Sequence, residues 1–73
     1  MNAENLNNPV ADNISSIIKG KGLKQCAVAE KAGYTKHELN HMLKGRKLMK
    51  QGDVVRLKKV LDVSYDELYE ERE

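Results

Sequence analysis

The sequence predicts a small all-α domain, and three observations support this fold class. Apolar residues recur at helical spacing in successive segments, no stretch reads as a β-strand, and glycines separate the periodic segments. The chain has 73 residues, which leaves room for one domain. A chain of this size buries about 60% of its exposable surface, so a deep enzyme pocket would consume most of the core. We therefore expect a protein that is not an enzyme.

The first two of five helices are predicted from their ends. Asn8 offers a capping side chain directly before Pro9, which suits the first helical position, and the helix is expected to end near Gly20 to Gly22. The second helix is barely two turns long. It is expected to stop at Gly33, because glycine readily adopts the left-handed conformation that closes a helix.

The other three helices are also predicted from local signals. Thr35 and Glu38 have the spacing of a capping box, in which each side chain satisfies the other residue's amide, so a third helix starts there and runs on to Gly45. A fourth helix is expected from about Gln51. The same capping pattern recurs at 64–67 and opens a short fifth helix.

The formal net charge of +2 conceals a strong segregation of charge along the chain. Residues 1–13 carry −2, residues 14–60 carry +9 from twelve Lys or Arg and three acidic residues, and residues 61–73 carry −5. A basic body between acidic ends indicates a polyanion as partner. The alternative at this stage is a solvated surface that is merely rich in lysine.

The single cysteine, Cys26, excludes an internal disulfide framework and a four-cysteine zinc site. Apolar packing alone must then hold the fold, which fits a reducing, cytoplasmic compartment. A redox switch at Cys26 is an alternative to an ordinary surface or half-buried thiol. We expect no transmembrane helix and no secretory signal, because the apolar runs are only two or three residues long.

Residues 37–41 match the His-Glu-x-x-His pattern, in which two histidines one turn apart bind zinc and the glutamate acts as general base. A catalytic site also needs a third protein ligand and a cleft, and the chain has no further histidine. Glu38 is in addition required by the capping box. We therefore predict no catalytic residues, no metal and no cofactor, with adventitious zinc or nickel binding by His37 and His41 as the more reasonable form of metal binding.

A second pattern uses far more of the chain. The segment from Gln25 to Met42 resembles the helix-turn-helix of the lambda-repressor and Cro-like family, also called the XRE family. Gln25 opens the second helix, Ala29 stands at the close contact between helices, Gly33 stands in the turn, and Leu39 and Met42 are the apolar anchors. The resemblance implies a compact five-helix DNA-binding domain with the helix-turn-helix formed by helices 2 and 3.

The resemblance covers residues 9–69, which leaves residues 1–8 as a flexible N-terminal segment and residues 70–73 as an acidic C-terminal tail. Three positions depart from the family pattern. Lys24 replaces the usual Ser or Thr cap of the second helix, Ile18 stands where the family often has Arg, and Asp62 replaces a common glycine after the fourth helix. These departures bear on local stability more than on function.

The resemblance also implies which residues contact DNA, because the third helix of such a motif lies in the major groove while the second crosses the backbone. Four residues are expected to read base edges: Lys36, His37, Asn40 and His41. Seven residues are expected to contact phosphates: Lys24, Gln25, Thr35, Lys44, Arg46, Lys47 and Lys50. For the cations that follow the third helix, an ordinary solvated loop is the alternative.

These expectations describe a bacterial or phage transcriptional regulator, in particular a small repressor, that binds double-stranded DNA. A homodimer on a palindromic site is expected, because a lone module of this size makes few base contacts. No membrane and no small-molecule ligand are inferred. The alternative from another class is a helix-turn-helix module that binds protein, as an antitoxin-like or adaptor protein does, through its acidic C-terminal end.

Overall fold

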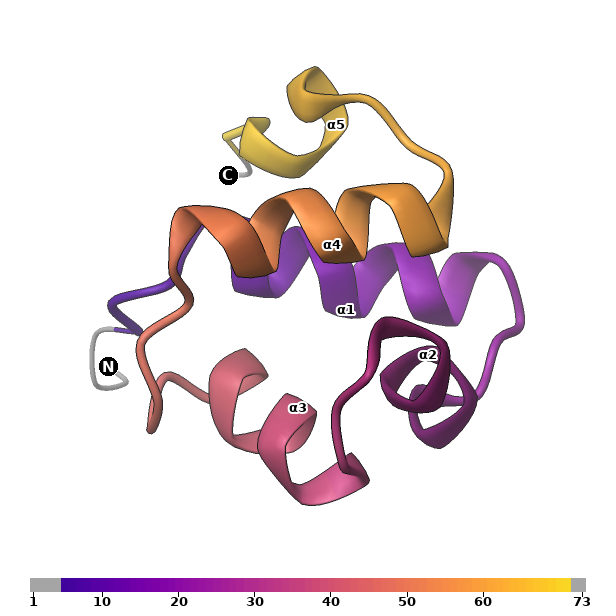
Figure 1. The fold of residues 1–73 in the computed structure, drawn as a ribbon. Coiled ribbons are helices and arrows are strands. Elements are labelled where there is room, and N and C mark those ends of the chain that lie inside the picture. Colours follow the sequence, from indigo (N-terminus) through magenta and orange to yellow (C-terminus); the bar gives the residue numbers. More distant parts are fainter. Residues whose placement is uncertain (1–4, 72–73) are drawn as a thin grey trace.

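The computed structural model describes residues 5–71, and within them it contains five α-helices and no strand. The all-α, five-helix expectation is therefore confirmed. The helices, labelled in Figure 1, are α1 (Val10–Gly20), α2 (Gln25–Ala32), α3 (Lys36–Leu43), α4 (Gln51–Leu61) and α5 (Tyr65–Tyr69).

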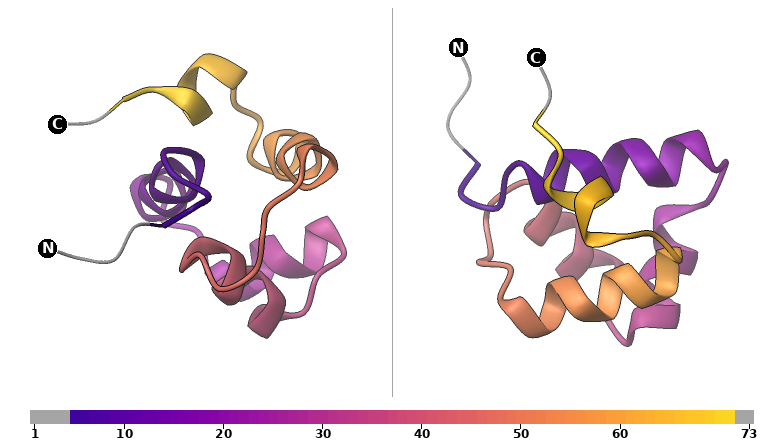
Figure 2. Two further views of the ribbon diagram at one scale, coloured as in Figure 1. Left: turned by 90° about the vertical axis from the view of Figure 1, so that its left-hand side faces the viewer. Right: turned by 90° about the horizontal axis from the view of Figure 1, so that it is seen from above.

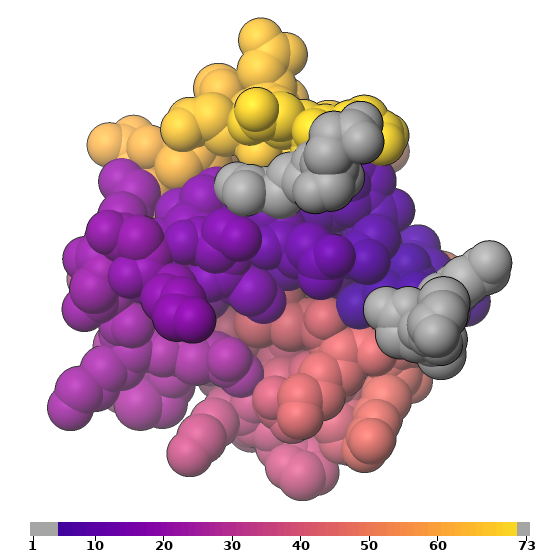
Figure 3. Space-filling model, turned by 180° about the vertical axis from the view of Figure 1, so that it is seen from behind, coloured from indigo at the N-terminus to yellow at the C-terminus, as the bar shows by residue number. Residues whose placement is uncertain are grey.

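The helices α1 and α4 lie side by side across the middle of the molecule, and the other three helices cover them from two sides (Figure 1). Figure 2 (left) looks along this pair and shows α5 on one side, with α2 and α3 on the other. From behind, α1 forms a band between α5 and the region of α3 (Figure 3). The helix-turn-helix thus occupies one side of the molecule and the C-terminal helix the opposite side.

The core consists of aliphatic side chains contributed by all five helices. Ala29 is fully buried where α2 packs on α3 and α4, which is the close contact that the sequence predicted for a small side chain. The largest fully buried apolar side chains are Ile14, Leu39, Met42, Leu57, Leu61 and Leu68. Because each helix is short, this shared core rather than the stability of any single helix holds the fold.

Several helix ends are formed as the local sequence signals predicted. Gly33 ends α2 with a left-handed backbone at φ 85°. The Thr35 hydroxyl accepts from the Glu38 amide at 3.0 Å, and the Glu38 carboxylate accepts from the Thr35 amide at 3.0 Å. The equivalent box at the start of α5 is formed by Ser64. These signals act within a few residues, so they can be recognised without knowledge of the tertiary structure.

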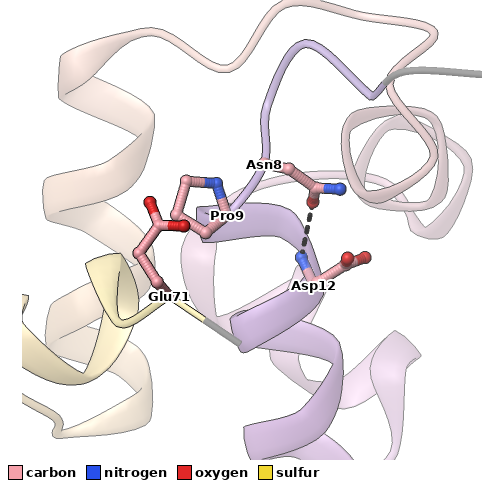
Figure 4. A pocket seen from close by; sticks show the side chains of 4 residues that line it. All are labelled: Asn8, Pro9, Asp12 and Glu71. Carbon is pink, nitrogen blue, oxygen red and sulfur yellow. Dashed lines mark hydrogen bonds between the residues drawn. The ribbon is translucent and has the colours of Figure 1, made fainter. Parts of the chain in front are cut away.

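The start of α1 differs in detail from the expectation. Pro9 itself is the N-cap residue, and the side-chain oxygen of Asn8 accepts a hydrogen bond from the Asp12 amide at 3.0 Å. Figure 4 shows this bond beside a shallow pocket that is also lined by Glu71, which follows α5. Asn8 therefore binds an amide of the first turn, but Pro9 precedes the first helical residue, Val10, instead of occupying that position as predicted.

The largest difference from the sequence expectation concerns the N-terminal segment. Residues 1–4 lie outside the described part of the chain, but Asn5 to Asn8 are attached to the domain instead of extending from it. Asn7 is only 7% exposed and makes three hydrogen bonds to the chain around the end of α3. At the other side of the molecule, the fully buried Asn13 donates to Leu68 and Glu70 carbonyls of the α5 segment at 2.6 and 2.8 Å.

Gly45 provides a test of this attachment. Its φ of +79° disfavours any L side chain, and a Cβ atom would lie 2.6 Å from Oδ1 of Asn5. We expect Gly45→Ala to destabilise the domain by about 1–3 kcal/mol. Gly22→Ala is the matched control, because Gly22 has a similar φ of +69° but no neighbour within 4 Å, and it should destabilise by only about 1 kcal/mol. The midpoints of urea unfolding measure both changes, and a loss in Gly45→Ala no larger than that in Gly22→Ala would contradict the packing of Asn5 on Gly45.

Candidate nucleic-acid interface

The side of α3 opposite the core carries the four residues expected to read bases. Lys36 and His37 in the first turn are exposed, whereas Asn40 and His41 in the next turn are half-buried. The opposite side of the helix is anchored in the core by the buried residues Leu39, Met42 and Leu43. The structure thus brings the four polar side chains together on one accessible helix face.

The two histidines of this face contact one another. Their ring centroids lie 4.4 Å apart, and the ring planes are inclined at 52°. Among the described residues, no third His, Cys, Asp or Glu joins them in a metal-binding group. Glu38, the residue between them in the His-Glu-x-x-His pattern, caps α3 and forms an ion pair with Lys47 at 3.3 Å. The geometry therefore assigns Glu38 a structural use that conflicts with the role of a general base.

The environment of Glu38 also favours its charged form. The backbone amide of Thr35 and then the ammonium group of Lys47 hold the pKa of this carboxyl below its ordinary value. The pair is exposed, with 51% of the Lys47 side chain and 42% of the Glu38 side chain accessible. Such an exposed ion pair is weak, so Lys47 can exchange this carboxylate for a phosphate.

The helix α2 packs against α3 in the helix-turn-helix (Figure 1). Lys24, at the N-cap position, has an extended backbone and makes no side-chain capping bond, as its departure from the family pattern predicted. Lys24 is exposed and Gln25 is half-buried. The first amides of a helix lack partners within the helix, so an anion can be bound there.

The loop between α3 and α4, residues 44–50, carries most of the cations expected to bind phosphate. It directly follows the polar face of α3. All four of its basic side chains are exposed: Lys44, Arg46, Lys47 and Lys50. Thr35 is also exposed and directly precedes α3. In the sequence, the expected base-reading residues thus lie between Thr35 and the cations of the loop.

A cluster of three residues that sequence analysis did not identify supports the turn between α2 and α3. The hydroxyl of Tyr34 in this turn donates to the Asp53 carboxylate in the first turn of α4, and the Arg56 guanidinium lies 5.5 Å from the Tyr34 ring centroid. Asp53 also accepts from the Lys50 amide at 3.0 Å and so caps α4. No local pattern relates Tyr34 to Asp53, because 19 positions separate them.

The pKa values of this cluster are displaced in opposite directions. Burial first, and then the hydrogen bond to Asp53, raise the pKa of Tyr34 to about 12. Burial alone would raise the pKa of Asp53, but the hydrogen bonds from Tyr34 and Lys50 and the charge of Arg56 bring it below its ordinary value. At neutral pH the cluster is therefore a neutral phenol that donates to an ionised carboxylate.

Cys26 and the two tyrosines of α5 are not among the residues expected to contact DNA. Cys26 is a free, exposed thiol in the first turn of α2. Tyr65 lies under the Lys58 ammonium at 5.0 Å, and Tyr69 is in the same short helix α5. Both tyrosines belong to α5, which lies on the side of the molecule opposite α3 (Figure 1), and their side chains are exposed.

Comparison with known proteins agrees with this architecture. A family model described as a helix-turn-helix domain matches residues 14–70, which is most of the chain and includes both α2 and α3. No curated protein and no solved structure gave a match. Within residues 5–71, no helix has the length and apolar character needed to cross a membrane.

The Tyr34 cluster makes the stability dependent on pH in a defined way. The Tyr34 hydroxyl contributes fully below its ordinary pKa of 10.0, and the contribution is lost as pH rises towards about 12. The Asp53 carboxylate contributes above its ordinary pKa of 3.8, and its contribution is lost as pH falls through the lowered pKa. We expect Tyr34→Phe to cost about 1–2 kcal/mol between these limits, with a smaller deficit beyond either one.

Urea unfolding across this pH range measures the deficit, and the ultraviolet absorbance of the ionised phenol measures the titration. Tyr34→Phe should remove a titration step near pH 12. Tyr65→Phe, which changes an exposed tyrosine of α5, is the control. A deficit that does not vary with pH would show that the hydroxyl is not bonded to a titrating partner.

Proposed function

Because the chain belongs to the helix-turn-helix domain family, we propose that it is a sequence-specific regulator of transcription that binds double-stranded DNA. It acts as a small repressor in the cytoplasm and inserts α3 into the major groove. The observation that carries this proposal is the face of α3, where four polar side chains project from a helix anchored in the core, directly before a loop with four cations.

The residue types on α3 suit the hydrogen-bonding groups of the major groove. Lys36 can donate to O6 or N7 of guanine, and Asn40 can bridge N6 and N7 of adenine. His37 is exposed in the first turn, where it can donate or accept, and its ring contacts that of His41. The packing of the two rings restricts their orientations, so their hydrogen bonds are directed before DNA arrives.

Phosphate contacts would set the orientation of α3 in the groove. We expect these contacts from the amino-terminal end of α2, with Lys24 and Gln25, and from the loop 44–50, which directly follows α3 in the chain. Thr35 has a hydroxyl that accepts from the Glu38 amide, so its proton is available for a phosphate oxygen.

A dimer on a palindromic site completes the proposal, because one short recognition helix reads few base pairs. The side of the molecule remote from α3 carries exposed aromatic rings, Tyr65 at 46% and Tyr69 at 51%, in α5. A contact between two copies through α4 and α5 would leave both α3 helices free for DNA.

Selection from a randomised duplex pool at low salt tests the proposal directly. We expect enrichment of related sequences, with half-sites about one helical turn apart if a dimer binds. The observed affinity should fall steeply with salt, with a logarithmic slope of about −0.9 for each phosphate bound. If no duplex is enriched, the regulator proposal is wrong, and a protein partner for the acidic C-terminal end becomes the alternative to pursue.

One substitution in α3 and one directly after it distinguish base reading from phosphate binding. Lys36→Ala should lower affinity for the selected site by about 1–3 kcal/mol and relax the preference at one base pair. Lys44→Ala, one residue beyond α3, should weaken binding to all duplexes alike and reduce the salt slope by about 1. Binding measurements on the selected site and on single-base variants distinguish these outcomes, and identical behaviour of the two variants would contradict the assigned groove geometry.

A further inference from the structure

The N-terminal residues Asn5 and Asn7 precede the stretch matched by the helix-turn-helix family, which begins at residue 14, yet they contact the end of α3 and the basic loop 44–50. Asn7 is 7% exposed, and its side-chain amide uses both its donor and its acceptor groups. Nδ2 donates to the Met42 carbonyl at 2.6 Å and to the Lys47 carbonyl at 2.9 Å. Oδ1 accepts from the Met49 amide at 2.9 Å.

These three bonds span the loop from one end to the other. Met42 is in the last turn of α3, Lys47 is in the middle of the loop, and Met49 lies two residues before α4. One side chain therefore fixes the distance between the end of the recognition helix and the second half of the loop. It also provides a partner for the Lys47 carbonyl and the Met49 amide, and a second donor for the Met42 carbonyl, which already accepts from the Gly45 amide.

Asn5 reinforces the same attachment. Its Nδ2 donates to the Leu43 carbonyl at 2.8 Å, and its Oδ1 accepts from the Asn7 amide at 2.9 Å. The Asn5 side chain also packs against Gly45, where a side chain on the loop would collide with it. The two asparagines thus hold both the last carbonyls of α3 and the loop that follows.

The loop has few other restraints on its second half. Its own backbone bonds join its first residues to α3, from the Gly45 amide to Met42 and from the Arg46 and Lys47 amides to His41. Beyond Lys47, the loop is held by the hydrogen bonds of Asn7, by the Met49 side chain in the core, and by the bonds that join Lys50 to the first turn of α4. The placement of the backbone that carries these cations therefore depends on a side chain 40 positions away from Lys47.

We infer that Asn7 is a positioning residue for DNA binding: it holds the loop 44–50 so that its cations meet the phosphates beside α3. This inference rests on the proposed function. A loop that is ordered in the free protein loses less conformational entropy on binding than one that must be ordered by the DNA. Asn7 itself touches no DNA in this arrangement, because it is buried beneath the loop.

The chain contains a matched control for this residue. Asn13 is another buried asparagine, and its Nδ2 also donates to two backbone carbonyls, those of Leu68 and Glu70. These bonds attach α1 to the α5 segment, on the side of the molecule opposite α3 (Figures 1 and 2). Replacement of Asn13 removes a comparable set of buried hydrogen bonds but leaves the loop 44–50 untouched.

The experiment compares Asn7→Ala, Asn13→Ala and the unchanged protein on the selected duplex, at a temperature where circular dichroism shows all three folded. We expect Asn7→Ala to bind about tenfold more weakly and to show a salt slope shallower by about 0.9 for each phosphate that the displaced loop no longer neutralises. Asn13→Ala should retain the original affinity and slope. Without DNA, hydrogen exchange at the Met49 amide should accelerate in Asn7→Ala alone.

The outcomes separate this inference from the function on which it rests. If the unchanged protein enriches no duplex, the proposed function fails whatever the variants do. If it binds DNA but Asn7→Ala matches Asn13→Ala in affinity and slope, the inference is wrong and Asn7 only stabilises the fold. Should Asn7→Ala not fold, Asn7→Ser retains a hydroxyl for one carbonyl, and binding about threefold weaker with a shallower slope is then expected. An unchanged affinity and slope in Asn7→Ser would overturn the inference.

Discussion

The close packing of α2 on α3 is the constraint on which the other features depend. Ala29 is fully buried at this contact, and the Tyr34 amide donates back to its carbonyl at 2.8 Å, after the chain has reversed at Gly33. A larger residue at Ala29 would separate the helices, and a side chain at Gly33 would strain the turn. Because the helices are joined by only three residues, 33–35, the direction of the outer face of α3 is determined by this contact. The polar residues of α3 therefore share one accessible face without any rearrangement of the helix.

The acidic groups of the molecule leave the positive charge around the polar face of α3 largely uncompensated. Glu38 and Asp53 are the carboxylates nearest the loop 44–50 in the chain, and both cap helices, so their negative charge is used locally. Their environments lower the pKa of each carboxyl: Glu38 through its hydrogen bonds to Thr35 and Lys47, and Asp53 through hydrogen bonds that outweigh its burial. Asp66 and Glu67 belong to α5, which lies on the other side of the molecule (Figure 1). The middle of the chain can therefore present a net positive surface although the total charge is only +2.

The fold and the outline of the interface could be predicted from the sequence because their determinants are local. Gly33, the capping boxes and the apolar spacing act within one or two turns, so the helix bounds were anticipated closely. The polar networks could not be predicted in the same way. Asn7 bonds to residues 35 to 42 positions away, and Asn13 to residues 55 and 57 positions away. A buried asparagine produces no periodic pattern in the sequence. The asparagine-rich N-terminal segment was therefore predicted to be a flexible segment outside the domain.

The attachment of residues 5–8 also gives the domain two levels of stability. These residues precede α1 and contribute polar bonds rather than core side chains, so we expect them to detach at a lower free energy than global unfolding, with the loss of the bonds that Asn7 and Asn8 make to the first turn of α1. Detachment would free the loop 44–50 but leave the core intact. The apparent affinity for a polyanion would then scale with the fraction of molecules in which the segment is attached. A substitution or a binding partner that acts on this segment could thereby adjust DNA occupancy without altering a single DNA-contacting side chain.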